Sequence, residues 1–193
     1  MSHDSLIPDP SLVPSHSERS SGSEASDYPP VPDYQDQFRQ YHIRSWQPLD
    51  RQAAGSVIAT VLAEYGLGWE PEGSDRDALE VEAHYWQTGG EFWVVFDGET
   101  LVGTAGYYPA HRGEKAVEIR KMYLRPSARG QGLGRYLLRQ LEARIQQRGF
   151  RHIWVETASV LKEAVQLYET SYYLPAEGVE TARCDRIYQK TLT

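Results

Sequence analysis

The spacing of apolar and polar residues predicts regular secondary structure from residue 41 onwards. Residues 41–46 alternate between the two classes, as a half-buried strand does. Pro48 and Asp50 then open a helix, with Asp50 as a plausible N-cap. Its apolar face repeats at helical spacing and comprises Val57, Ile58, Val61, Leu62 and Tyr65. A second helix is expected over about 75–87, before the paired glycines Gly89 and Gly90.

The middle of the chain predicts three consecutive strands. Residues 91–96 and 100–109 flank the dipeptide Asp97-Gly98, a typical hairpin turn. A third strand is expected over 116–124, where Pro126 closes it.

The rest alternates between helix and strand. A long helix is expected to run to about residue 148, with Leu137, Leu138, Leu141 and Ile145 on its apolar face. A strand over 152–157, a helix over 161–171 and a final strand over 186–191 follow. This order of elements predicts an α/β fold with a mixed, mostly antiparallel sheet and helices on both faces.

The first 37 residues have a different composition. They contain six of the eleven prolines, many serines, and seven acidic residues against the single base Arg19. A segment with so few apolar residues buries too little surface to offset its ordering entropy, so we expect a disordered acidic tail over 1–37 and one domain over 38–193. A solvated tail is the favoured interpretation, and a partner-binding or phosphorylated tail is the alternative.

Charge and cysteine content exclude several classes of protein. The net charge is -7, of which the tail carries -6, so the remainder is near neutral and offers no basic surface for nucleic acid. The chain has no apolar run of the length that a membrane span needs, and no secretory signal. The lone Cys184 fits a reducing compartment and thus a cytoplasmic location. The scattered histidines predict no metal site.

The segment 129–134, Arg-Gly-Gln-Gly-Leu-Gly, carries the chemistry. Glycines between a strand and a helix let the backbone N–H groups converge on a phosphate at the positive end of the helix dipole. A P-loop would need a Gly-Lys-Ser/Thr that is absent here. In a dinucleotide fingerprint the third glycine would fall on Arg135, and the preceding strand is too charged to be a buried parallel strand. An acyl-CoA pyrophosphate loop and a ligand-free glycine turn both stay open.

The longer segment 118–134 resembles the central motif of the GNAT (Gcn5-related N-acetyltransferase) superfamily. Arg129, Gly132 and Gly134 occupy the three defining positions of its Arg/Gln-x-x-Gly-x-Gly/Ala pattern. The resemblance continues through 154–157 and through 164–169, which is similar to the family's Ala-x-x-Leu-Tyr-Glu helix, and it spans about residues 41–192. Two departures stand out. Leu161 replaces a usual Asn, which implies a lost cofactor contact, and Tyr172-Tyr173 replaces Gly-Phe, which implies a different helix ending.

The resemblance implies that acetyl-CoA binds between the strands 116–124 and 152–157. It places pantetheine along the main chain of Met122, Tyr123 and Leu124, and the pyrophosphate on the loop formed by Arg129, Gly130, Gln131, Gly132, Leu133 and Gly134. An N–H there, such as that of Met122, would polarise the thioester carbonyl.

Two side chains are candidates for catalysis. Tyr168 matches the family tyrosine near the thioester sulfur and would be the general acid, with a plain core tyrosine as the alternative. Glu118 would be the general base, with ion pairing to Arg120 or Lys121 as the alternative of equal weight. Cys184 is expected to lie away from the cofactor motif and is not proposed as a nucleophile. The loop 65–72 combines aromatic and acidic residues and would suit a cationic amine.

The predicted function is therefore direct acetyl transfer from acetyl-CoA to an amine, on a small molecule or a peptide. The main alternative is a non-catalytic acyl-CoA-binding regulatory module. An adaptor acting through its acidic tail and a nicotinamide-dinucleotide-binding protein are more distant alternatives. Many relatives dimerise, so a homodimer stays open.

Overall fold

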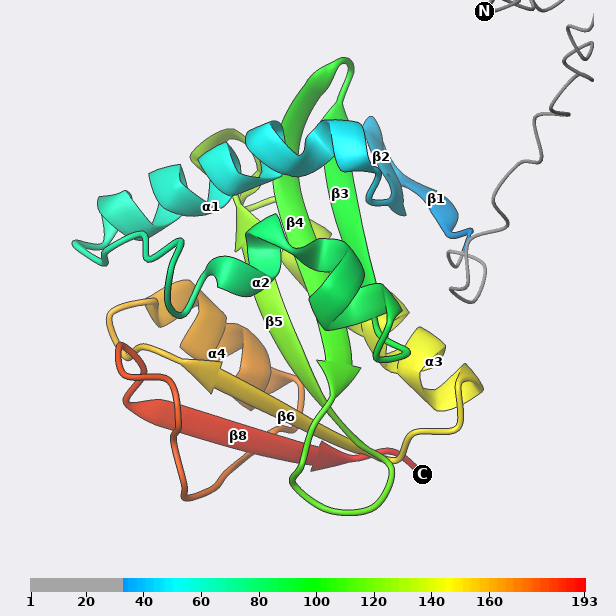
Figure 1. The fold of residues 1–193 in the computed structure, drawn as a ribbon, viewed down its shortest axis with the longest axis vertical. Helices are drawn as coiled ribbons and strands as arrows, with labels where there is room; N and C mark the ends of the chain where they lie inside the picture. Colours follow the sequence, from blue (N-terminus) through cyan, green and yellow to red (C-terminus); the bar gives the residue numbers. More distant parts are fainter. Residues whose placement is uncertain (1–32) are drawn as a thin grey trace, which may run out of the picture.

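The computed structural model describes residues 33–193, which form one eight-stranded sheet flanked by helices (Figure 1). The strands lie in the order β1-β2-β3-β4-β5-β6-β8-β7. Neighbours are antiparallel except for β5 and β6, which are parallel. Their bounds are β1 Gln35–Phe38, β2 Tyr41–Ser45, β3 Glu91–Asp97, β4 Thr100–Pro109, β5 Ala116–Leu124, β6 His152–Thr157, β7 Leu174–Pro175 and β8 Arg186–Thr191.

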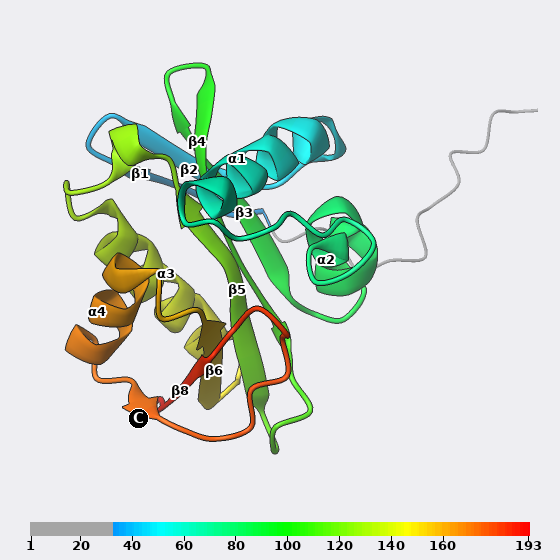
Figure 2. The ribbon, with the colours of Figure 1, turned by 90° about the vertical axis from the view of Figure 1, so that its left-hand side faces the viewer.

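The helices cover both faces of the sheet. Figure 2 shows α1 (Arg51–Glu64) and α2 (Arg76–Leu79) on one side, and α3 (Leu133–Gln147) and α4 (Lys162–Thr170) on the other. This arrangement confirms the predicted fold class. None of the helices in residues 33–193 is long and apolar enough to cross a membrane.

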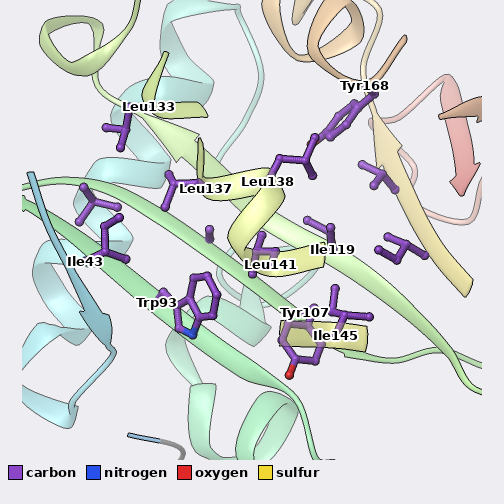
Figure 3. Packing of buried hydrophobic residues seen from close by; sticks show 14 of the residues in the cluster. Ile43, Trp93, Tyr107, Ile119, Leu133, Leu137, Leu138, Leu141, Ile145 and Tyr168 are labelled. Carbon is purple, nitrogen blue, oxygen red and sulfur yellow. The ribbon is translucent and has the colours of Figure 1, made fainter. Parts of the chain in front are cut away.

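Each face of the sheet has its own hydrophobic core, because side chains alternate along β3. Trp93 and Val95 face α3, whose leucines pack against them together with Tyr107 and Ile119 (Figure 3). Phe92 and Val94 face α1 and α2 on the other side. Trp93 is fully buried, and Trp86 packs against Trp46.

A β-bulge in β5 parts this strand from β6. Three steps of β5, from Arg120 to Tyr123, oppose two steps of β4, so Lys121 is the extra residue, and its φ of 51° is left-handed. The parallel pairing with β6 begins at Ala116 and ends at Ile119. Beyond that point the two strands diverge, which opens space between them.

Strand structure is found within the segment that the sequence predicted to be disordered. Residues 1–32, where most of the predicted disorder falls, lie outside the described residues. The boundary at residue 37 is wrong, because Gln35–Phe38 pairs with β2. Tyr34 stacks on Trp93 at 3.8 Å between ring centroids, and Asp36 accepts hydrogen bonds from the hydroxyls of Tyr34 and Tyr136. One stacked ring and these two bonds anchor a segment whose composition resembles the tail.

Two helix predictions also need correction. The expected helix over 75–87 is broken into α2 and a π-helical turn, Glu82–Trp86, because Asp75 and Asp77 turn inward to bind cations. The end of α4 keeps the form that a glycine would give, since Tyr172 adopts a φ of 65°. The amides of Tyr172 and Tyr173 donate to the carbonyls of Glu169 and Tyr168, as in a Schellman motif. The different ending expected from the lost glycine is therefore not found.

Candidate active site

A cavity of about 300 Å³ lies where β5 and β6 diverge. Its walls come from β5, from the end of β6, from the glycine loop before α3, from α4 and from the C-terminal end of α1. Most of the predicted site residues line it, namely Glu118, Met122, Tyr123, Leu124, Arg129, Gly130, Gly132, Gly134 and Tyr168. The fold thus brings together residues that are up to 50 positions apart in the sequence, from Glu118 to Tyr168.

The glycine loop forms an anion cradle at one end of this cavity. Gly130 and Gly132 have left-handed φ values of 73° and 86°, which an L side chain rarely adopts. The first helical hydrogen bond of α3 runs from the Tyr136 amide to the Gly132 carbonyl. The amides of residues 133–135 therefore have no partner within the helix, and no side chain in the described part of the chain caps the helix. These amides and the helix dipole suit a pyrophosphate.

Two members of the predicted loop contribute no side chain to the cavity. Gln131 donates hydrogen bonds to the Tyr41 hydroxyl and the Ser127 carbonyl. Leu133 is buried in the hydrophobic core (Figure 3). Sequence reasoning also missed Arg135, which lines the cavity one helical step beyond Gly134 and adds a cation beside the cradle. Its position in the first turn of the helix was the available signal.

The Arg129 side chain points along the edge of the cavity to α1. Its guanidinium donates to the Leu124 carbonyl at 2.8 Å and to Glu64 at 2.8 Å. The Tyr65 hydroxyl lies 3.3 Å away and itself donates to Glu163 at the start of α4. One buried guanidinium nitrogen of Arg129 has no partner among the described residues. Arg129 therefore keeps a donor free for a phosphate while it joins the loop to α1.

Glu118 lies inside the cavity with little compensation for its charge. Its side chain is 9% exposed, and a 3.3 Å bond from Arg120 is its sole partner among residues 33–193. Burial is the main cause that raises the pKa of the carboxyl to about 6, with Arg120 opposing this and the Glu156 charge adding to it. Lys121 pairs with Asp75 and Asp77 instead. Of the two ion pairs predicted as alternatives for Glu118, the structure therefore contains the one with Arg120, at a long distance, and not the one with Lys121.

Tyr168 projects from α4 to the edge of the core that α3 covers (Figure 3). It is 5% exposed, and its ring lies 5.6 Å from Tyr173 and 6.1 Å from Tyr188, measured between centroids. Its hydroxyl bonds to no other residue within 33–193. Burial raises the pKa of this phenol well above its ordinary value, so the phenol keeps its proton at neutral pH. Tyr168 is both a core residue and a wall of the cavity.

Cys184 is the clearest error of the sequence analysis. The residue lines the same cavity as Arg129 and Tyr168, although it was expected to lie away from the cofactor motif. The segment before β8 folds back over β5 and carries Cys184 with it. Burial raises the pKa of the thiol to about 11, so it is protonated at neutral pH and a poor nucleophile.

The fold and the cradle together define an enzyme class, the acyl-CoA-dependent transferases. The amide cradle suits the pyrophosphate, and the diverging strands leave room for an extended thioester arm. A buried carboxylate, that of Glu118, and a protonated phenol, that of Tyr168, line the same cavity.

The comparisons agree with this class. The model of the acetyltransferase (GNAT) family matches residues 24–172. The uncharacterized N-acetyltransferase YjgM of Escherichia coli K12 is 37% identical over 124 residues, which cover 62% of this chain and 74% of that protein. Rat N-acetyltransferase 8B is 30% identical over 97 residues, but these span only 46% of this chain and 44% of the rat protein. The chain belongs to the GNAT acetyltransferase family.

Solved structures agree on the fold. A GNAT acetyltransferase from Staphylococcus aureus Mu50 superposes with a TM-score of 0.73 at 17% identity, covering 79% of this chain and 99% of that one. The Salmonella typhimurium protein yncA, solved with acetyl-CoA, has a TM-score of 0.64 at 18% identity over 80% and 95% of the two chains. The protein is thus an acetyltransferase of this family, which uses acetyl-CoA as its cosubstrate.

Proposed function

We propose that this protein moves the acetyl group of acetyl-CoA directly to an amine, with Glu118 as general base and Tyr168 as general acid. The observation that carries the proposal is the shared cavity. A weakly partnered carboxylate and a phenol that bonds to no other residue within 33–193 line the space that begins at the glycine loop. The acceptor is an amine on a small molecule or a peptide.

The two groups have the protonation states that the reaction needs. Acetyl-CoA supplies the acetyl group as a thioester, and the new amide bond forms as the carbon–sulfur bond breaks. An amine has a pKa near 10 and is mostly protonated at neutral pH. It must lose protons to attack the thioester and form the amide. Glu118, with a pKa of about 6, is ionised at neutral pH and accepts a proton from the attacking nitrogen. Tyr168 holds its proton and delivers it to the departing sulfur.

Replacing Tyr168 with Phe tests the acid role. The change removes only the hydroxyl, so we expect kcat/KM to fall by about 100-fold, the low end for loss of a general acid. The affinity for acetyl-CoA should change by less than about threefold, because the cradle is untouched. The measurement is release of free thiol from acetyl-CoA against a panel of amines and peptides, with calorimetry for binding.

Tyr173→Phe is the matched control. Tyr173 lies in the same cluster, 5.6 Å from Tyr168, but outside the wall of the cavity, so its hydroxyl should not affect turnover. Equal activity of wild type and Tyr168→Phe would refute the acid role. Tight acetyl-CoA binding without thiol release for any acceptor would favour the non-catalytic regulatory module.

Two further proposals rest on the sequence. We propose a cytoplasmic location, which the lone cysteine supports. We also propose a homodimer, which is supported by the dimerisation of many relatives. Sedimentation of the purified chain would decide the second.

A further inference from the structure

The cavity accommodates only one half of a CoA molecule. The pyrophosphate of CoA joins the thioester arm to a ribose that carries a 3′-phosphate and the adenine base. With the pyrophosphate at the glycine loop, at one end of the cavity, the thioester arm extends into the cavity and the nucleoside half stays outside it. Residues that bind the 3′-phosphate would therefore lie next to the glycine loop without lining the cavity.

The turn between β1 and β2 lies at such a position. A Cβ atom on Gly132 would be 3.8 Å from Cζ of Phe38, the last residue of β1. The Phe38 ring also packs on Tyr136 in the first turn of α3, with 4.6 Å between the ring centroids. Neither Phe38 nor the following Arg39 lines the cavity. Figure 2 shows this turn next to the segment that leads into α3.

Both strands that flank the turn are bonded to the cradle region. Asp36 on β1 accepts a hydrogen bond of 2.6 Å from the Tyr136 hydroxyl on α3. The Tyr41 hydroxyl on β2 accepts one of 2.9 Å from Gln131 in the glycine loop. The position of the turn relative to the glycine loop is therefore fixed.

Arg39 has an unusual backbone conformation in this turn. Phe38 pairs with Tyr41, so Arg39 and Gln40 make up the whole turn. The φ of Arg39 is 54°, in the left-handed region where two-residue hairpin turns favour glycine or asparagine. Its guanidinium carbon lies 5.3 Å from the centroid of the Phe38 ring, and it forms no ion pair with a carboxylate of residues 33–193. Arg39 is thus an exposed cation that is available to a ligand.

The two other arginines beside the loop serve the cavity itself. The Arg129 guanidinium donates to Glu64 on α1 at 2.8 Å, and both Arg129 and Arg135 line the cavity. Arg39 lies outside the cavity, beyond the Phe38 ring that contacts Gly132. It therefore supplies positive charge where the nucleoside half of CoA leaves the cradle.

We propose that Arg39 binds the 3′-phosphate of CoA, so that the enzyme prefers thioesters of CoA to thioesters of carriers that lack this phosphate. A guanidinium binds phosphate through charge-assisted hydrogen bonds, which are stronger than bonds between neutral groups. The inference concerns the cosubstrate and does not depend on the catalytic roles proposed for Glu118 and Tyr168.

Calorimetry with CoA and with 3′-dephospho-CoA tests this inference without turnover. We expect wild type to bind CoA about tenfold more tightly than 3′-dephospho-CoA, the effect of one hydrogen bond to a charged group. In Arg39→Gly, the affinity for CoA should fall about tenfold and that for 3′-dephospho-CoA by less than about twofold, so that the preference is lost. Glycine adopts a left-handed φ without strain, so this variant keeps the shape of the turn.

Two variants control the experiment. Arg39→Lys keeps a cation on the turn without the planar guanidinium, and it should retain part of the preference for CoA. Arg151→Ala removes an exposed arginine just beyond the opposite end of α3, and thus the same charge, and it should retain all of the preference. Urea denaturation of each variant checks that it folds like wild type.

Each outcome bears on the proposal. Equal affinity of wild type for the two compounds, or an unchanged preference in Arg39→Gly, would overturn it. A similar loss of affinity for both compounds in Arg39→Gly would also overturn it, because Arg39 would then act at the pyrophosphate. Loss of the preference in Arg39→Gly but not in Arg151→Ala would support it, whether or not any amine releases thiol from acetyl-CoA.

Discussion

Replacing Glu118 with Gln should lower kcat/KM for the preferred amine by about 100- to 1,000-fold, within the range for loss of a positioned general base. The amide has the size of the carboxyl but accepts no proton. Wild type should lose activity as the pH falls through about 6, because Glu118 is then protonated. In Glu118→Gln that loss should be absent, leaving only the rise that follows deprotonation of the amine. Initial rates of thiol release between about pH 5 and pH 9 measure both.

The same carboxyl makes a prediction about stability. Its folded pKa of about 6 lies above the ordinary 4.5, so the folded state holds the proton more tightly than the unfolded chain. Unfolding free energy should therefore decline as pH rises from about 4.5 to about 6, by up to ~2 kcal/mol, and Glu118→Gln should lack this decline.

Glu114→Gln is the control for both measurements. Glu114 is exposed in the turn before β5, four residues from Glu118. Its replacement by Gln removes the same charge from the protein. Its pH profile should match that of wild type. If Glu118→Gln kept the wild-type kcat/KM and still lost activity as the pH fell through about 6, Glu118 would be excluded as the base.

Replacing Lys121 with Ala should lower the free energy of unfolding by about 3–5 kcal/mol, the usual cost of removing one partner from a buried ion pair. The Lys121 side chain is 2% exposed, and its ammonium lies 2.7 Å from Asp75 and 3.1 Å from Asp77. Without it, Asp77 keeps Arg120 and Asp75 keeps Arg183, yet each carboxylate loses a cation at a site from which water is excluded. Urea denaturation measures the change.

Acid titration distinguishes this electrostatic cause from a simple packing defect. Burial by itself would raise the pKa of Asp75, but Arg183 and Lys121 outweigh it and lower the pKa to about 2. The contribution of Asp75 is therefore present above its unfolded pKa of 3.8 and is lost as pH falls towards about 2. In Lys121→Ala, the free energy of unfolding should fall less than in wild type over this acidic pH range. Arg76→Ala breaks the exposed pair with Glu80. It should leave both the free energy of unfolding and its dependence on acidic pH unchanged.

Local patterns explain how much of the fold could be predicted. Strands β2 to β6 and β8, and helices α1, α3 and α4, follow from periodicity and turn residues, because each buries one regular face. The phosphate cradle was equally predictable, since Gly130 and Gly132 need left-handed backbone that few other residues adopt.

The residues that the sequence analysis missed depend on contacts between distant segments. Arg183 meets Asp75 across 108 positions and Lys121 meets it across 46, so no local spacing signals the pairing. Cys184 lines the cavity for the same reason, because the segment between β7 and β8 places it there. The bulge at Lys121 also has no sequence signature, because a lysine with φ of 51° looks like any strand lysine. Inward-facing Asp75 and Asp77 broke the predicted second helix by the same tertiary pairing.

The most direct test of the proposed reaction is to follow the acetyl group itself. Wild type would be mixed with isotopically labelled acetyl-CoA at an amount equal to the enzyme, first without and then with the best amine of the panel. Direct transfer predicts no label on the protein at any time, and label recovered as an amide of the acceptor. Label retained on Cys184 or elsewhere on the chain before the amine is added, or no labelled amide after it is added, would contradict direct transfer to an amine.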